Sequence, residues 1–317
     1  MKLIIQIPCY NEEKTLPSTI HDLPDKIDGI DTIEYLIIDD GSSDKTIEVA
    51  QRNGVHHILK NGTNIGLAKT FMKGLQFCLE HGADIVVNTD GDNQYFGGDI
   101  PLLVEPIINN QADIVVGSRP ISKHKEFSKF KKKLQYLGSY ILRVISKTDI
   151  KDAVSGFRSF SKEACLELNI YSKFSYCTET LIQAGNSNLR VTSVDIRVNP
   201  KTRESRLFSN IFEHIYKSSV TMITMFILYR PGRFFLSIGN FFFSLSLIIG
   251  VRFLYLTYWI PVREEGRTYI PSLILLSLFS FLGIFSYSLA VIGELIKYLR
   301  ILLEKINKNL KSLLYQK

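Results

Sequence analysis

The chain of 317 residues lacks the cysteine and histidine spacings that bind structural zinc. The four cysteines, Cys9, Cys78, Cys165 and Cys177, are widely scattered, with no CxxC pair and no histidine at metal spacing. This pattern argues against a zinc module. It indicates reduced thiols in a reducing compartment.

Signatures of secretion, dinucleotide binding and nucleic-acid binding are missing as well. Residues 1–8 contain too short an apolar run for a signal peptide, so we expect the large N-terminal part to stay in the cytoplasm. The absence of GxGxxG argues against a dinucleotide-binding Rossmann domain with its usual fingerprint. Much of the formal charge of +7 lies beside apolar segments and in the C-terminal tail, which favours anionic lipid headgroups over nucleic acid as its partner.

What the sequence does contain is an alternation of short apolar runs and helical segments up to about residue 198. The runs predict strands at Leu3–Ile7, Tyr35–Ile38, His56–Leu59, Asp84–Val87, Asp113–Val116 and Val191–Val198. Helices are expected at Thr15–Leu23, Lys45–Asn53, Leu67–Glu80, Ile100–Asn109, Tyr136–Lys147 and Thr180–Ala184. The alternation predicts an α/β fold with a mainly parallel, right-handed sheet.

The most informative stretch, Asn88-Thr89-Asp90-Gly91-Asp92-Asn93-Gln94, follows one of these predicted strands. Two carboxylates one residue apart at the carboxyl end of a strand occupy the place where α/β folds bind ligands. Their hard oxygen atoms suit Mg²⁺ or Mn²⁺, which substrate phosphates also bind. An acidic turn has the same composition, so this stretch alone leaves both interpretations open.

Three other polar segments stand out. Asp39–Asp44 suits a nucleotide's base, ribose or phosphate, although Ser43 or Asp44 also serves as an ordinary helix N-cap. Lys123–Lys133 holds seven cationic residues when His124 is counted, as a solvated loop or as a segment that meets a phosphate or the membrane. Asp152–Arg158 is a second dense polar motif, with Glu179 on a helix expected to face it.

The last third of the chain is apolar and predicts membrane association. Phe234–Ile260 and Ile270–Gly293 each exceed the ~20 apolar residues that cross a bilayer, and the polar loop 261–269 joins them into a hairpin. Before the hairpin, apolar residues between Phe208 and Ile227 recur largely at three- and four-residue spacing. This spacing predicts an amphipathic helix in the membrane interface, or alternatively a core helix of the soluble domain.

The cationic residues orient this hairpin. Residues 201–233 carry six Lys or Arg, residues 294–317 carry six more, and the connecting loop carries only Arg263 and Arg267. By the positive-inside rule, both ends of the hairpin lie in the cytoplasm. Two crossings are too few for a transporter and indicate an anchor.

Taken in order, the polar motifs resemble those of family 2 glycosyltransferases. They are Pro8-Cys9-Tyr10-Asn11-Glu12, Asp39-Asp40-Gly41-Ser42-Ser43-Asp44, Asp90-Gly91-Asp92, Gly117-Ser118-Arg119 and Asp152-Ala153-Val154-Ser155-Gly156-Phe157-Arg158. With the hairpin, essentially the whole chain is similar to the dolichol-phosphate mannose synthase branch, which includes bacterial polyprenyl-phosphate glycosyltransferases. The resemblance implies a GT-A nucleotide-diphospho-sugar transferase fold over residues 1–205, a juxtamembrane amphipathic helix over 206–233, a transmembrane hairpin over 234–293 and a basic cytoplasmic tail over 294–317.

The resemblance also implies roles for individual residues. Nucleotide contacts are expected from Pro8, Tyr10, Asn11, Glu12, Asp40 and Asp90, and Mg²⁺ or Mn²⁺ would be held against the diphosphate by Asp90, Asp92 and Gln94. The expected catalytic set is Asp92, Arg119 and Asp152, with Asp152 as a base or as a residue that positions the sugar or the acceptor. Acceptor or phosphate contacts are expected from Lys132, Ser155, Arg158, Glu179, Arg203 and Arg206, although the family more often has Arg where Lys132 stands.

The expected activity is inverting transfer of one sugar from a nucleotide sugar to a polyprenyl phosphate at the cytoplasmic face of the membrane. The expected partners are a donor of the GDP-mannose or UDP-glucose type, the lipid acceptor and membrane lipids, with no nucleic acid. Relatives suggest a homo-oligomer, and we expect a prokaryotic plasma membrane. Nothing in Asp39–Asp44 distinguishes GDP from UDP.

Two alternatives stay open, one of which is another enzyme and the other a non-catalytic protein. A processive polysaccharide synthase would usually need more membrane helices and a Gln-x-x-Arg-Trp motif, but the only tryptophan is Trp259, in the hairpin. A non-catalytic scaffold could bind nucleotide or lipid without transferring sugar. The intact Asp90/Asp92 pair argues against the scaffold.

Overall fold

The computed structural model describes residues 1–120, 143, 146, 148, 150, 152–170, 176–200, 219–220, 223–259 and 269–315. The chain divides into two compact units, which are Met1–Met222 with Ile306–Lys317, and Ile223–Lys305. Lys132, Arg203 and Arg206 lie outside the described residues, as does most of the segment predicted to be amphipathic.

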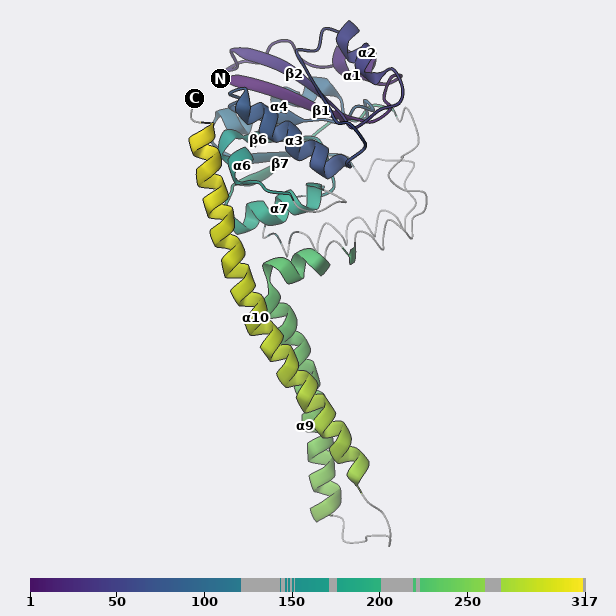
Figure 1. Ribbon diagram of the computed structural model, residues 1–317, viewed down its shortest axis with the longest axis vertical. Coiled ribbons are helices and arrows are strands. Elements are labelled where there is room, and N and C mark those ends of the chain that lie inside the picture. The colour runs from purple at the N-terminus through teal and green to yellow at the C-terminus, as the bar shows by residue number, and fades with distance from the viewer. Residues whose placement is uncertain are drawn as a thin grey trace. The chain divides into compact units, whose positions relative to one another are not determined.

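The first unit contains a seven-stranded mixed sheet with helices along its length (Figure 1). The strands are β1 Lys2–Cys9, β2 Thr32–Asp39, β3 His57–Lys60, β4 Ile85–Asn88, β5 Ile114–Ser118, β6 Arg158–Ser161 and β7 Val191–Asp195. The helices are α1 Leu16–His21, α2 Thr46–Arg52, α3 Leu67–Glu80, the short 3₁₀ helix η1 Gly97–Asp99, α4 Ile100–Ile108, α6 Lys162–Glu167 and α7 Tyr176–Asn186. The predicted α/β fold is confirmed.

One strand, β6, was not predicted. The sheet order is β3-β2-β1-β4-β6-β5-β7, and β6 pairs antiparallel with both β4 and β5 while the other pairs are parallel. Arg158 stands opposite both Asn88 on β4 and Val116 on β5. Because β6 runs against its neighbours, its first residue lies where theirs end. The polar motif Asp152–Arg158 is thereby brought to the carboxyl edge of the parallel strands.

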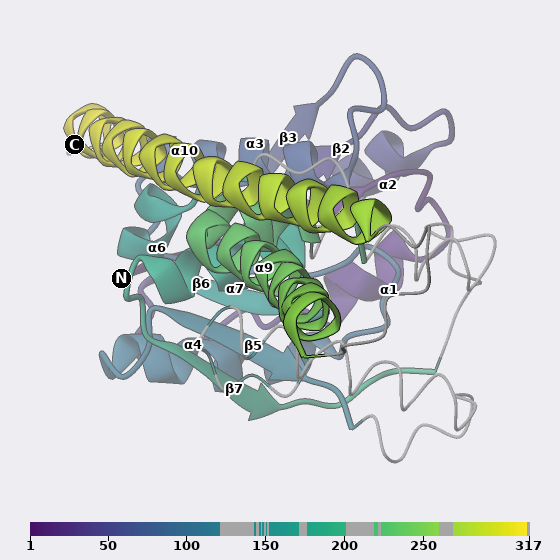
Figure 2. The same cartoon turned by 90° about the horizontal axis from the view of Figure 1, so that it is seen from below.

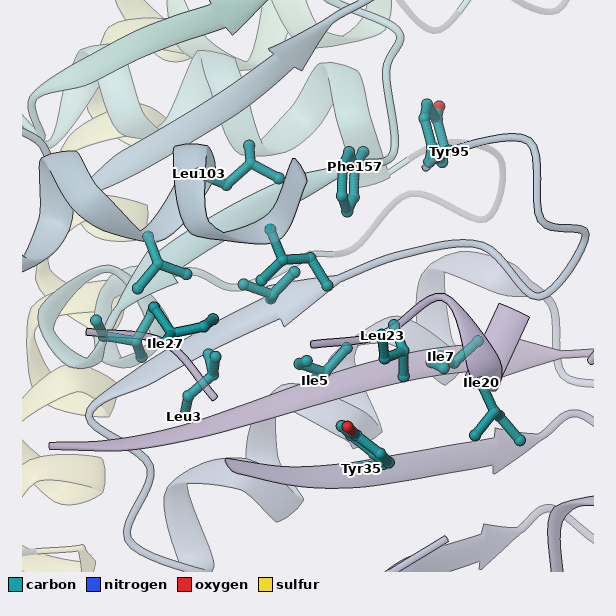
Figure 3. Close-up of a cluster of buried hydrophobic side chains, with 14 of the residues drawn as sticks. Leu3, Ile5, Ile7, Ile20, Leu23, Ile27, Tyr35, Tyr95, Leu103 and Phe157 are labelled. Carbon is teal, nitrogen blue, oxygen red and sulfur yellow. The ribbon is translucent and has the colours of Figure 1, made fainter. Parts of the chain in front are cut away.

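Burial on both faces explains the unbroken apolar runs. Every residue of β1 from Leu3 to Cys9 is buried, as expected for a strand covered on both sides by helices. Figure 3 shows Leu3, Ile5 and Ile7 on the same side of β1 as Leu103 of α4. On the other side, Gly74 of α3 packs so closely that an added Cβ would lie 2.3 Å from the Gln6 Oε1 atom.

The second unit contains helix α9 Pro231–Tyr258 and the part of helix α10 Ile270–Leu314 up to Lys305, which lie side by side (Figures 1 and 2). The hydroxyl groups of Ser246 and Ser280 are 2.7 Å apart, and an added Cβ on Gly239 would meet the Tyr287 ring at 2.5 Å. Small residues thus allow close contact between the helices. Both are long and apolar enough to cross a bilayer, consistent with the predicted transmembrane hairpin.

The end of α10 belongs to the first unit, where it binds α6. Lys311 Nζ donates to the Leu168 carbonyl oxygen at 3.0 Å and to Asn169 Oδ1 at 2.9 Å. Lys308 forms ion pairs with Glu163 and Glu167. Residues 294–314, expected as a basic tail, are therefore described as a continuation of α10 that docks through its cationic side chains.

We predict that Lys311→Ala destabilises the first unit while Lys305→Ala does not. The substitution removes charge-assisted bonds to acceptors near the end of α6, which should cost about 1–3 kcal/mol and lower Tm by roughly 2–4 °C per kcal/mol. Lys305 is exposed on the same helix. Thermal unfolding of the full-length variants in one detergent checks the prediction, and equal Tm values for both variants would contradict it.

Candidate active site

The parallel strands bring three predicted motifs to one edge of the sheet. Cys9 at the end of β1 pairs with Asp39 at the end of β2, and Gln6 of β1 pairs with Asn88 at the end of β4. The loops that follow these strands carry Tyr10–Glu12, Asp40–Asp44 and Asp90–Gln94. This edge is where open α/β sheets bind their ligands.

The first two loops hold each other through hydrogen bonds. Asn11, at a positive φ of 56°, donates its N–H to Ser42 Oγ at 2.9 Å and accepts at Oδ1 from the Ser43 N–H at 2.8 Å. Glu12 donates its N–H to Thr46 Oγ1 at 2.8 Å. Beside these contacts, Pro8 is buried and Tyr10 is 41% exposed. The exposed ring leaves Tyr10 accessible to a ligand.

Asp40 fixes the loop that leads into α3. Its Oδ1 accepts from the Ile65 N–H at 2.9 Å and from Asn61 Nδ2 at 3.0 Å, and its Oδ2 accepts from the Gly66 N–H at 3.0 Å. Both carboxylate oxygens are therefore engaged by the protein. The structure gives this carboxylate a loop-holding role in addition to the expected nucleoside contact.

The Asp90–Gln94 turn is fixed by α1. The hydroxyl groups of Thr15 and Thr19 donate to the Gly91 carbonyl oxygen at 2.8 and 3.2 Å. Asp92 Oδ1 accepts from the Gln94 N–H at 3.2 Å. Next to it, Asn93 Oδ1 is buried without a hydrogen-bond partner among the described residues. The turn is held in place, carries oxygen atoms that can coordinate a cation, and contains a buried hydrogen-bond acceptor without a partner. These features are compatible with a ligand that completes the site.

The donor set fits a divalent cation of the magnesium type. Asp90, Asp92 and Gln94 are partly buried and offer two carboxylates and one amide oxygen. Within the described residues, no group of three or more His, Cys, Asp or Glu side chains forms a metal site. Magnesium characteristically binds one or two carboxylates and takes its other ligands from water and substrate phosphates. These residues therefore fit Mg²⁺ or Mn²⁺ only together with such a substrate.

Arg119 and Asp152 form a bidentate ion pair at the same edge. Arg119 Nε donates to Asp152 Oδ2 at 2.6 Å, and Nη2 donates to Oδ1 at 3.1 Å. The Asp152 side chain is fully buried, while 21% of the Arg119 side chain is exposed. Burial alone would lower the pKa of Arg119, but the neighbouring Tyr95 and Asp152 raise it above its usual value. The site thus keeps a fixed guanidinium cation.

The peptide of Gly156 is held on both sides by side chains that sequence reasoning missed. Its N–H donates to Tyr95 Oη at 3.0 Å. Its carbonyl oxygen accepts from Asn88 Nδ2 at 3.0 Å and from the Tyr176 hydroxyl at 3.2 Å. An added Cβ on Gly156 would lie 3.2 Å from Asp90 Oδ1. This clamp sets the loop containing Asp152 against the Asp90 carboxylate.

Three predicted acceptor residues are buried. Arg158 donates to the carbonyl oxygens of Ser155, Cys177 and Ala153, each at 2.8 Å, and is 0% exposed. This geometry favours a bracing role for Arg158 over the expected phosphate contact, because its donors point to protein acceptors. Ser155 and Glu179 are also fully buried.

Comparisons with known proteins agree with this architecture. Residues 4–168 match the model of the family described as Glycosyl transferase family 2. The UDP-N-acetylglucosamine–dolichyl-phosphate N-acetylglucosaminyltransferase of Methanococcus voltae is 33% identical over 213 residues, covering 60% of this chain and 83% of that protein. The dolichol-phosphate mannosyltransferase of Pyrococcus furiosus is 32% identical over 231 residues, covering 68% and 63%. The undecaprenyl-phosphate mannosyltransferase of Micrococcus luteus is 28% identical over 176 residues, covering 54% and 70%.

Solved structures show the same fold. Glucosyl-3-phosphoglycerate synthase from Mycobacterium tuberculosis, in complex with Mn²⁺, UDP and glucosyl-3-phosphoglycerate, superposes with a TM-score of 0.54 at 18% identity, covering 71% of this chain and 78% of that one. The same enzyme in complex with Mg²⁺ and UDP gives a TM-score of 0.53 at 17% identity, with the same coverage. At these identities the likeness concerns the fold alone.

We predict that Asp152→Ala destabilises the first unit by about 3 kcal/mol, because it leaves the Arg119 charge largely buried and unpaired. Replacing both partners, as Arg119→Met with Asp152→Leu, should cost less than the sum of the single changes. Glu48→Ala is the control, since Glu48 and Arg52 form an exposed pair on α2 of the kind that contributes about 0–1 kcal/mol. Thermal or urea unfolding compares Asp152→Ala, the single variants Arg119→Met and Asp152→Leu, their double variant and Glu48→Ala. Additive effects of Arg119→Met and Asp152→Leu would refute the coupling.

Proposed function

The chain belongs to glycosyl transferase family 2, and from that premise we propose that it transfers one sugar from a nucleotide sugar to a polyprenyl phosphate at the cytoplasmic face of the membrane. Its homologues are polyprenyl-phosphate sugar transferases. The observation that carries the proposal is the Asp90–Gln94 turn beside the Arg119–Asp152 pair, on a chain that also contains two helices of membrane-spanning length. The donor is of the GDP-mannose or UDP-glucose type.

The donor diphosphate would lie against the Asp90–Gln94 turn. Asp90, Asp92 and Gln94 would hold Mg²⁺ or Mn²⁺, and the bound ion would supply charge stabilisation for the departing nucleoside diphosphate. The loops of Tyr10–Glu12 and Asp40–Asp44 would contact the nucleoside, with Tyr10 as the accessible aromatic ring. Their mutual hydrogen bonds support this assignment, because they hold the loops in place before a ligand binds.

Arg119 would meet negative charge on a phosphate, and Asp152 would position it. Both oxygens of Asp152 accept from the Arg119 guanidinium, which favours positioning over proton abstraction. The acceptor does not need a strong base, because a phosphate monoester has a second pKa of roughly 6 and is anionic near neutral pH. A fixed cation aimed at developing charge is the larger contribution to such a transfer.

The proposed orientation follows from charge placement. The loop between α9 and α10 carries Arg263 and Arg267, whereas residues 201–233 and 294–317 carry six Lys or Arg each. This bias supports a cytoplasmic location for both ends of the hairpin. The sheet edge with the site would then be on the side of the membrane where nucleotide sugars are available.

We predict that Asp92→Asn reduces sugar transfer by about 10²–10³-fold, the loss typical of removing one group that stabilises transition-state charge. Membranes that contain the full chain are supplied with polyprenyl phosphate, Mn²⁺ and a panel of labelled nucleotide sugars. Asp28→Asn, a substitution of an exposed carboxylate, should leave transfer unchanged. Equal transfer by wild type and Asp92→Asn with every accepted donor, or no transfer by wild type with any donor, would rule out the proposal.

We predict that Gly156→Ala reduces transfer roughly 10- to 100-fold, because the added Cβ would lie 2.8 Å from the Tyr176 hydroxyl and 3.2 Å from Asp90 Oδ1. Overpacking of about 1–3 kcal/mol would disturb both the clamp and the carboxylate, and 1.36 kcal/mol is tenfold in rate. The Mn²⁺ concentration for half-maximal transfer should rise as well. Gly62→Ala is the control, since an added Cβ there meets nothing within 4 Å. Unchanged kinetics in Gly156→Ala would show that the clamp does not position Asp90.

A further inference from the structure

One face of α10 carries an apolar seam that continues beyond the predicted membrane span. Its side chains alternate at four- and three-residue intervals, the spacing of a coiled-coil interface. Each of the seven is between 51% and 70% exposed. We call this set the α10 seam, which consists of Ile292, Ile296, Leu299, Leu303, Ile306, Leu310 and Leu313.

A different face of the same helix binds the first unit. Lys308 pairs with Glu163 and Glu167, and Lys311 donates to Asn169 Oδ1 and to the Leu168 carbonyl oxygen. At 100° per residue, these two lysines point about 80–140° away from Leu303 around the helix axis. The docking contacts therefore hold the last turns of α10 while Ile306, Leu310 and Leu313 stay exposed.

The bilayer does not account for the exposed seam. Helix α10 has 45 residues, which at 1.5 Å per residue is about 67 Å, against ~30 Å of hydrocarbon. An unbroken helix that spans the bilayer cannot also lie flat on its surface, so the part after Glu294 extends into water. Six of the seven seam residues, all except Ile292, lie in this part, and a continuous row of exposed leucine and isoleucine side chains needs an apolar partner in water.

We propose that the α10 seam packs against the same seam of a second copy of this chain. The inference rests on the membrane placement proposed above, because the hairpin would give all copies the same orientation and hold their α10 helices parallel. In a parallel coiled coil each seam residue faces its own counterpart. The alternating spacing favours such a helix partner, since it keeps the seam facing one neighbour over three heptads.

The test uses single cysteines in the full chain, in lipid nanodiscs or diluted liposomes. Leu303→Cys and Leu310→Cys place a thiol on the seam, and Lys305→Cys places one on another exposed face of α10. The four native cysteines are buried, so the wild type sets the background. Mild oxidation should link Leu303→Cys and Leu310→Cys chains into dimers at least tenfold faster than Lys305→Cys chains, and excess lipid should not prevent it.

Two outcomes would overturn the proposal. Equal cross-linking at Lys305→Cys and Leu303→Cys would indicate random collision. Absent cross-linking, together with quenching of a fluorophore at Leu310→Cys by spin-labelled lipids, would place the seam on the bilayer surface. Because cross-linking needs no substrate, chains that link at the seam but transfer no sugar would contradict the proposed function and leave the seam interface supported.

Discussion

The site depends on a single buried peptide, that of Gly156. Its N–H and carbonyl groups are hydrogen-bonded to Asn88 and Tyr95, which flank the Asp90–Gln94 turn, and to Tyr176 at the start of α7. All three side chains are buried, and an unsatisfied polar group there would cost about 1–3 kcal/mol. Their orientations are therefore coupled. The Asp90 carboxylate lies against Gly156 and Asp152 lies four residues before it, so the ion pair and the turn share one support.

The antiparallel strand β6 makes this arrangement possible. A parallel strand between β4 and β5 would deliver its preceding loop to the opposite edge of the sheet. Because β6 runs the other way, residues 152–157 arrive beside the ends of β4 and β5, where Arg158 pairs with Asn88 and Val116. Buried Arg158 then braces this loop, because it donates to the carbonyl oxygens of Ala153 and Ser155 within the loop and of Cys177 on α7. The loop reaches the site because β6 is antiparallel, and the hydrogen bonds of Arg158 hold it there.

The sequence predicted those strands and helices whose positions local patterns of apolar residues determine. Apolar runs located β1, β2, β4 and β5 to within a few residues, and helix α3 begins and ends at the predicted Leu67 and Glu80. The polar strand β6, Arg-Ser-Phe-Ser, has no such run, since its stability comes from two neighbouring strands. Likewise, the pairing of Arg119 with Asp152 joins residues 33 apart, and no local period marks it. The sequence held a weak indication that Asn88 belongs to the site, because it is a polar residue at the end of an apolar strand.

The cationic residues after the hairpin have two separable effects. The positive-inside rule counts Lys308 and Lys311 whatever they contact, so the topology argument keeps its full count of six. Attraction to anionic headgroups is different, because Lys308 is paired with carboxylates and Lys311 with carbonyl oxygens of its own chain. These two cationic groups are already bound by acceptors of the protein itself. Charge in this region therefore supports the orientation of the hairpin more strongly than it supports lipid binding by a free tail.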